Sequence, residues 1–157
     1  MNRLKREFYL SLNRKLEALL EGETHWLANM ANTAALLFDE LAEINWAGFY
    51  LLDQEELMLG PFQGKPACVR IPLGKGVCGT AALKREIQIV PDVHKFPGHI
   101  VCDPTSRSEI VLPILAGGSL VGVLDIDSPI LNRFTEDDGE GLAVIVTTLV
   151  NKSDWER

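Results

Sequence analysis

Two apolar, strand-like runs at residues 108–115 and 120–127 constrain the fold more than any other part of this sequence. They are separated by residues 116–119, Ala-Gly-Gly-Ser, a segment short and glycine-rich enough to form a tight turn. We expect the two strands to pair across this turn as a hairpin. The sequence therefore favours a sheet that is mainly antiparallel.

Helical periodicity marks both ends of the chain, and strand-like patterns fill the middle. Apolar residues recur at helical spacing from residue 3 to 20, before Gly22, and again after Thr24, which we expect to be a helix N-cap. Thr135-Glu-Asp-Asp resembles a capping box and opens a last helix. We also expect strands at 44–53, 56–62, 67–71 and 87–90 and a short helix at 77–84. Together these elements predict an α+β domain with a central antiparallel sheet.

Length and charge limit the classes of function. The 157 residues suit a single domain spanning residues 1–157. Asp and Glu number 22 against 15 Lys and Arg, a net charge of −7, and the basic residues form no cluster. We therefore expect binding neither to nucleic acid nor to an anionic membrane. No apolar run is long enough to span a membrane, and charges interrupt the N-terminal segment, so we expect a cytoplasmic protein.

Three carboxylates stand among the apolar residues of the predicted hairpin. Asp125 and Asp127 are two apart on one strand and point to the same face, and Glu109 lies on the partner strand. Carboxylates that share a partly dry pocket cannot all ionise cheaply, so at least one pKa should be raised. A neutral acid there can donate a proton to a substrate oxygen, and a charged one can pair with an ammonium group. The alternative is a solvated strand end, with Asp127 capping the next turn.

The cysteines at positions 68, 78 and 102 are the candidate reactive groups. Cys102 lies in a proline-bounded loop at 91–106 that we expect to be exposed and mobile, so its thiol is open to chemistry. Cys78 follows a Gly-Lys-Gly turn at a predicted helix N-terminus, where the helix dipole would stabilise a thiolate; it is a second candidate nucleophile. Cys68 lies in a predicted strand, where a small core residue is the commoner use of cysteine.

The arrangement of the thiols favours redox chemistry over metal binding. The sequence contains no Cys-x-x-Cys pair, and the histidines at positions 25, 94 and 99 have no familiar ligand spacing, so we expect neither a metal nor a cofactor. Three scattered thiols fit a relay in which one attacks, a second closes a disulfide and the third is spare.

Two aromatic residues mark a possible ligand slot. Trp46 and Tyr50 share one face of the strand predicted at 44–53, with Gly48 between them. A gap without a side chain between two rings would accept a small polarised group. Packing within an ordinary core is the commoner use of strand aromatics.

From about residue 20 onward the chain resembles the free methionine-(R)-sulfoxide reductases, compact enzymes with the GAF fold. The resemblance rests on the three cysteines at the family's spacing, the acids and the tryptophan, and on five motifs. These are NWAGFY at 45–50, GKGVCGTAA at 74–82, FPGHIVCD at 96–103, SRSEIVLP at 106–113 and GVLDIDS at 122–128. The GAF scaffold alone would be a weak guide, because one fold carries many functions.

The resemblance implies both an architecture and roles for the site residues. It implies one GAF-like domain, with N- and C-terminal helices on one face of the sheet and a mobile loop over the ligand pocket. Cys102 would attack the sulfoxide sulfur and become a sulfenic acid, Cys68 would resolve it as a disulfide, and Cys78 would join a further exchange. A thioredoxin-type partner would restore the thiols. Glu109 and Asp127 would hydrogen-bond to the sulfoxide oxygen and help to protonate it. Asp125 would help to hold the amino group, and Trp46 would pack against the substrate methyl.

Two other classes of function remain open at this level. A non-catalytic GAF domain that senses a small molecule would keep the fold without the chemistry. Against it, no phosphate cradle is visible beyond Gly74-Lys75-Gly76, a turn that also serves as a helix lead-in. A pure dimerisation module would leave the costly acids and the loop thiol without a reason, although the first two helices suit a homodimer contact.

Overall fold

The computed structural model describes residues 2–156. The helices are α1 (Arg3–Leu20), α2 (Trp26–Glu40), α3 (Gly76–Lys84) and α4 (Glu136–Lys152), with a single 3₁₀ turn at Val93–Lys95. The strands are β1 (Trp46–Asp53), β2 (Glu56–Gly64), β3 (Arg70–Pro72), β4 (Gln88–Val90), β5 (Ser108–Ala116) and β6 (Ser119–Ser128). All the predicted elements are present, most within two residues of the expected bounds.

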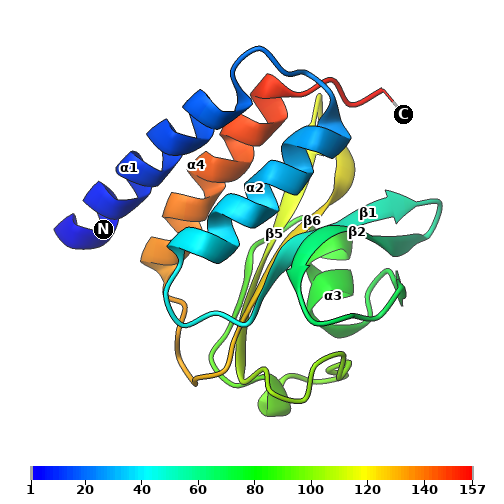
Figure 1. The fold of residues 1–157 in the computed structure, drawn as a ribbon. Helices are drawn as coiled ribbons and strands as arrows, with labels where there is room; N and C mark the ends of the chain where they lie inside the picture. The colour runs from blue at the N-terminus through cyan, green and yellow to red at the C-terminus, as the bar shows by residue number, and fades with distance from the viewer. Residues whose placement is uncertain (1, 157) are drawn as a thin grey trace.

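One antiparallel sheet of order β3-β2-β1-β6-β5-β4 forms the middle of the molecule. Helices α1, α4 and α2 lie side by side across one face, while α3 and the loop before β5 lie on the other (Figure 1). This is the α+β architecture expected from the sequence, with the terminal helices on the same face. Within the described residues, no helix is both long and apolar enough to cross a membrane.

Alternation along the central strands divides the core in two. On β1, Ala47 and Phe49 face the helical layer, whereas Trp46 and Tyr50 face α3. All of these side chains are at most 2% exposed, so both faces of the sheet are buried. The helical layer therefore covers one face and leaves the other for α3 and the loop, and it is on this second face that the predicted acids lie.

Two local predictions are wrong. The N-cap of α2 is His25, whose Nδ1 accepts a hydrogen bond from the Leu27 N–H at 3.2 Å, and not Thr24. The carbonyl of Thr24 accepts from the Asp154 N–H at 2.7 Å, a bond that accompanies the isolated bridge between His25 and Asp154.

The strand predicted at 67–71 is displaced. It starts only at Arg70, so Cys68 lies in the connection between β2 and β3 and not within a strand. The Tyr50 hydroxyl donates a hydrogen bond to the Cys68 carbonyl at 2.9 Å. This bond holds the β2–β3 connection against the α3 face of the sheet, so that residue 68 does not pair as part of a strand.

Candidate active site

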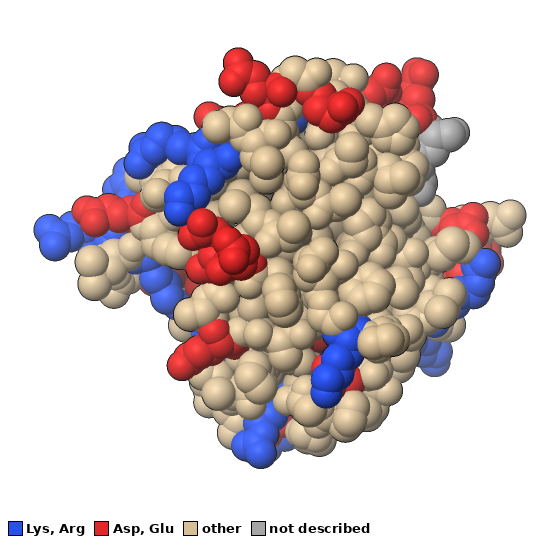
Figure 2. Space-filling view, in the orientation of Figure 1, with Lys and Arg blue, Asp and Glu red and all other residues tan. Residues whose placement is uncertain are grey.

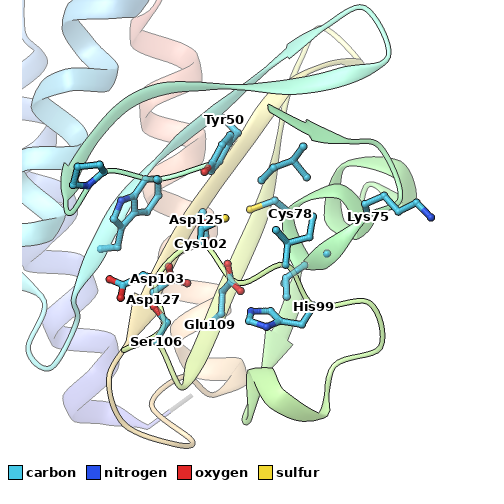
Figure 3. A pocket seen from close by; sticks show the side chains of 17 residues that line it. Tyr50, Lys75, Cys78, His99, Cys102, Asp103, Ser106, Glu109, Asp125 and Asp127 are labelled. Atoms are coloured by element: carbon cyan, nitrogen blue, oxygen red, sulfur yellow. The ribbon is translucent and has the colours of Figure 1, made fainter. Parts of the chain in front are cut away.

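A small pocket lies between the sheet, α3 and the loop that precedes β5 (Figure 3). Its volume is about 40 Å³, room for only one or two water molecules. The sequence-predicted residues that line it are Trp46, Tyr50, Cys78, Cys102, Glu109, Asp125 and Asp127. Of the predicted site residues, only Cys68 is not part of the lining, and it is bonded to a residue that is.

The three predicted acids come together on the α3 side of the sheet. Glu109 on β5 lies directly opposite Asp127 on β6, and Asp125 lies one step further along β6 (Figure 3). Glu109 and Asp125 are 7% and 5% exposed, while Asp127 is half-buried. The alternation of β6 puts Leu124 and Ile126 into the helical core, as the sequence indicates. The solvated strand end is therefore excluded for Glu109 and Asp125.

The environment of this cluster favours protonated acids. Burial, followed by repulsion from Asp125 and Asp127, raises the pKa of Glu109 well above its ordinary value. Burial and then the charge of Asp125 do the same for the pKa of Asp127. The pKa of Asp125 is also raised by burial, but hydrogen bonds with its neighbours oppose that effect. Asp125 is thus the acid best placed to stay ionised, and the other two are the better proton donors.

Cys78 is not the activated thiol that its position at a helix start indicates. It lies in the first turn of α3 but is only 4% exposed. Burial, then the charges of Asp125 and Glu109, raise the pKa of the Cys78 thiol well above its ordinary value. These effects outweigh the helix dipole, so Cys78 remains a neutral thiol at pH 7.

Cys68 and Cys102 form a disulfide, with their Cα atoms 5.4 Å apart. It joins the β2–β3 connection to the loop before β5 and spans 34 residues of sequence. Cys102 is half-buried, not exposed as the sequence led us to expect. The interpretation of Cys68 as an ordinary core residue is also wrong, because Cys68 forms a disulfide with Cys102, which is 34 residues away in the sequence.

The slot expected between Trp46 and Tyr50 is closed. The two rings stack on one another with their centroids 5.9 Å apart, and Phe62 stacks on the other side of Trp46 at 5.2 Å. A side chain at Gly48 would overlap Phe62 and the Trp46 ring. The glycine therefore allows close packing between strands, and the aromatic residues form a wall of the pocket.

Two polar residues that sequence reasoning missed hold the loop in place. The Asn45 side-chain amide donates to Asp103 at 3.1 Å, to Thr105 at 3.3 Å and to Ser106 at 3.0 Å. Ser106 in turn bonds to the Asp127 carboxyl, which partly offsets the rise in its pKa. No periodicity marks Asn45 as part of the site; only its place directly before β1 and beneath the loop does so.

One group of side chains in the pocket has the composition of a metal site. The ligand atoms of Cys78, Glu109 and Asp125 all lie within 4.8 Å of one another. These residues come from α3, β5 and β6, so their grouping cannot be read from spacing along the chain.

Comparisons with known proteins agree on one family. The model of the GAF domain matches residues 16–151. The chain is 57% identical over 145 residues to free methionine-R-sulfoxide reductase of Escherichia coli strain K12, which covers 92% of this chain and 88% of that protein. It is 47% identical over 157 residues to the enzyme of the same name from Saccharomyces cerevisiae, covering 95% and 87%.

A solved structure resembles the fold equally closely. The structure of fRMsr of Staphylococcus aureus in complex with its substrate superimposes with a TM-score of 0.88 and 53% sequence identity. The match covers 92% of this chain and 94% of that one.

Proposed function

This chain belongs to the free methionine-R-sulfoxide reductases, a family of oxidoreductases built on the GAF domain, and on that premise we propose that it reduces free L-methionine-(R)-sulfoxide with Cys102 as nucleophile. The observation that carries this proposal is the Cys68–Cys102 disulfide beside a cluster of buried acids. A thiol pair and proton donors in one pocket are what sulfoxide reduction requires.

In the first step the Cys102 sulfur attacks the sulfoxide sulfur. The sulfoxide oxygen is a poor leaving group until it is protonated, so Glu109 and Asp127, whose pKa values are raised by burial, serve as proton donors. The protonated oxygen then passes to the Cys102 sulfur while the bond between the two sulfurs breaks, which leaves a sulfenic acid and releases methionine. The proton given by the acid is replaced by the one that the Cys102 thiol loses. The sulfur of the substrate is reduced by two electrons while that of Cys102 is oxidised by two.

In the second step Cys68 attacks the sulfenic acid, water leaves, and the disulfide forms. A dithiol partner of the thioredoxin type then supplies two electrons and two protons to restore both thiols. Cys78, a buried neutral thiol beside Asp125, is the reserve thiol for a further exchange. Of the two candidate nucleophiles, Cys102 is favoured because its loop can move, whereas Cys78 is fixed in α3.

Substrate binding uses the walls of the same pocket. Asp125, the acid most inclined to stay ionised, pairs with the substrate ammonium, while Trp46 and Tyr50 pack against the methyl and methylene groups. A pocket of about 40 Å³ is too small for methionine sulfoxide. The disulfide and the small pocket are what we expect of the oxidised form after turnover, and in this proposal reduction of the disulfide frees the loop and opens the pocket.

Turnover with separated epimers tests this function. With dithiothreitol as reductant, the protein converts L-methionine-(R)-sulfoxide to methionine, measured by amino-acid chromatography, and leaves the S epimer intact. The S epimer is a matched control, because only the arrangement around the sulfur differs. The small-molecule sensor would instead show binding without turnover of either epimer.

Single-turnover measurements assign the thiols. Cys102→Ser abolishes methionine release from one equivalent of substrate, because the attacking sulfur is lost. Cys68→Ser still releases one equivalent but recycles slowly, since the sulfenic acid has no partner. Cys78→Ser keeps the single turnover. Loss of the first methionine in Cys78→Ser alone would assign the nucleophile to Cys78 and contradict the proposal.

A cytoplasmic location and a homodimer complete the proposal. The reduced thiols it needs are typical of the cytoplasm.

Over α2, Figure 2 shows a broad area without charged residues, and Leu27 and Phe38 of this helix are 47% and 38% exposed. Such an area suits contact with a second copy, and sedimentation analysis of the oxidised protein decides between monomer and dimer.

A further inference from the structure

Three buried groups in the pocket are arranged as ligands for a metal ion. Cys78, Glu109 and Asp125 come from α3, β5 and β6 and point toward one another (Figure 3). One ligand atom from each, the Cys78 sulfur and a carboxylate oxygen of the two acids, lies within 4.8 Å of the others. They are 4%, 7% and 5% exposed, so a bound ion would be largely shielded from water.

A second observation points to a missing partner at the same place. Asp125 forms hydrogen bonds with its neighbours, but its Oδ1 atom is buried and accepts none. On the neighbouring strand Asp125 faces Gly48, which has no side chain to offer. A buried carboxylate oxygen without a partner is costly, and a cation would remove that cost.

Lys75 and His99 also line the pocket, but neither forms an ion pair with the three acids among the described residues. In the part of the chain that the structure describes, the ion pairs of Lys, Arg and His involve other acids, and none includes Glu109, Asp125 or Asp127. Buried acids are normally paired or bound to a metal. This cluster therefore has the ligands for an ion and no ion-paired side chain to compete with it, and an ion that binds here displaces the protons of Cys78 and Glu109.

We propose that Cys78, Glu109 and Asp125 form a binding site for Zn²⁺. Sulfur together with carboxylate oxygen selects zinc over Mg²⁺ and Ca²⁺, which prefer oxygen alone. Three protein ligands leave the fourth zinc position to water. Because the proposed function gives Glu109 and Asp125 to the substrate, zinc and methionine sulfoxide exclude one another, and zinc is a reversible inhibitor. This last consequence rests on the proposed function; the site itself does not.

The disulfide form allows a clean test, because Cys78 is its free cysteine. Titration of the oxidised protein with Co²⁺, a spectroscopic substitute for Zn²⁺, produces a thiolate-to-cobalt charge-transfer band that Zn²⁺ abolishes. The band is absent in Cys78→Ser, and Glu109→Gln and Asp125→Asn each weaken Co²⁺ binding by about tenfold or more. Asp103→Asn is the matched control, an acid that lines the same pocket outside the group; it leaves binding unchanged.

Two results would overturn the site: no charge-transfer band in the wild type, or a band of equal affinity in Glu109→Gln and Asp125→Asn. A shift of the wild-type melting temperature by Zn²⁺, smaller in these two variants at the same zinc concentration, gives an independent readout. The melting transition of each variant without zinc also shows that the variant is folded.

A competition experiment separates the site from the function. The Cys68→Ser, Cys102→Ser double variant keeps Cys78 as its only thiol and cannot turn over. The R epimer of methionine sulfoxide displaces Co²⁺ from it and the S epimer, which is an equal chelator in solution, does not. If Co²⁺ binds and neither epimer displaces it, the zinc site stands, but inhibition and the substrate roles of the acids are wrong.

Discussion

At the scale of single residues, the buried acids lower the stability of the folded protein and at the same time provide proton donors in the pocket. Glu109 is buried without an ion-pair partner, and burial, followed by repulsion from Asp125 and Asp127, raises its pKa well above the ordinary value. The folded protein therefore holds a proton on Glu109 that the unfolded chain has already released at neutral pH. A stored proton is what a sulfoxide oxygen needs, so the loss of stability and the proposed catalysis have the same physical origin.

This stored proton makes stability depend on pH. The pKa of Glu109 is raised well above its ordinary value of 4.5, so the folded state binds more protons than the unfolded state above that pH. The free energy of unfolding is accordingly highest, as far as Glu109 contributes, below the unfolded pKa and falls as pH rises toward the folded pKa. The fall is at most about 1.4 kcal/mol per pH unit for one proton.

Glu109→Gln removes this proton and should flatten the dependence. Urea unfolding of the disulfide form between about pH 5 and pH 8 checks it. Asp103→Asn is the control: burial opposes ionisation of Asp103, but hydrogen bonds from Thr105 and Asn45 outweigh it and lower the pKa. Asp103 is therefore ionised in both states over this pH range, and its variant should keep the wild-type slope. Equal slopes in wild type and Glu109→Gln would show that Glu109 is ionised in the folded protein.

At the scale of elements, the helical layer depends on the close approach of α1 and α4. The Tyr9 hydroxyl of α1 donates to Asp138 of α4 at 2.8 Å, and Lys5 pairs with the same carboxylate at 2.7 Å. Asp138 also closes the capping box with Thr135, as the sequence predicted. The Tyr9 ring then lies directly against Gly141, where any Cβ would overlap it.

Two glycines of α4 form a matched pair for testing that contact. Gly141→Ala should lower the free energy of unfolding by on the order of 1–3 kcal/mol, because the Tyr9 ring must shift. Gly139→Ala meets only ordinary contacts, the nearest 3.6 Å away at Ile89, and should raise it by up to about 1 kcal/mol through helix propensity. Denaturant unfolding of both variants measures this. An equal rise in the free energy of unfolding of both variants would mean that α1 and its Tyr9 ring move aside at little energetic cost.

At the scale of the whole molecule, the sheet separates structure from chemistry. The three long helices cover one face, and the other carries α3, the acids and the cysteine loop (Figure 1). The loop is held at two points, by the disulfide to Cys68 and by the hydrogen bonds of Asn45. Neither cysteine belongs to the core beneath the helical layer, so opening and closing the disulfide in the proposed redox cycle breaks no contact of that core.

Reduction should therefore weaken the molecule as a whole. The disulfide closes a segment of 34 residues. The loop-entropy relation for such a segment gives a loss of on the order of 3–4 kcal/mol in the free energy of unfolding when it is opened. Thermal unfolding with and without dithiothreitol measures the loss, and the Cys68→Ser, Cys102→Ser variant should not respond to the reductant. A wild type that melts at the same temperature in both states would contradict a stabilising role.

The sequence by itself determined the elements and the faces of the strands. The periods of 2 and 3.6 are local, so they predicted the helices and put Asp125 and Asp127 on the same face. The hairpin at 116–119 brought Glu109 onto the neighbouring strand. The single domain and the substrate roles of these residues remain predictions.

Only the tertiary structure decided which side chains meet across the pocket. It buried Cys78 against the acids and reversed the effect of its helix start, filled the space at Gly48 with Phe62, and brought Asn45 under the loop. Periodicity fixes the direction of a side chain within its own element. Distances between atoms from different elements depend on how loops close and layers pack, and no local pattern records these.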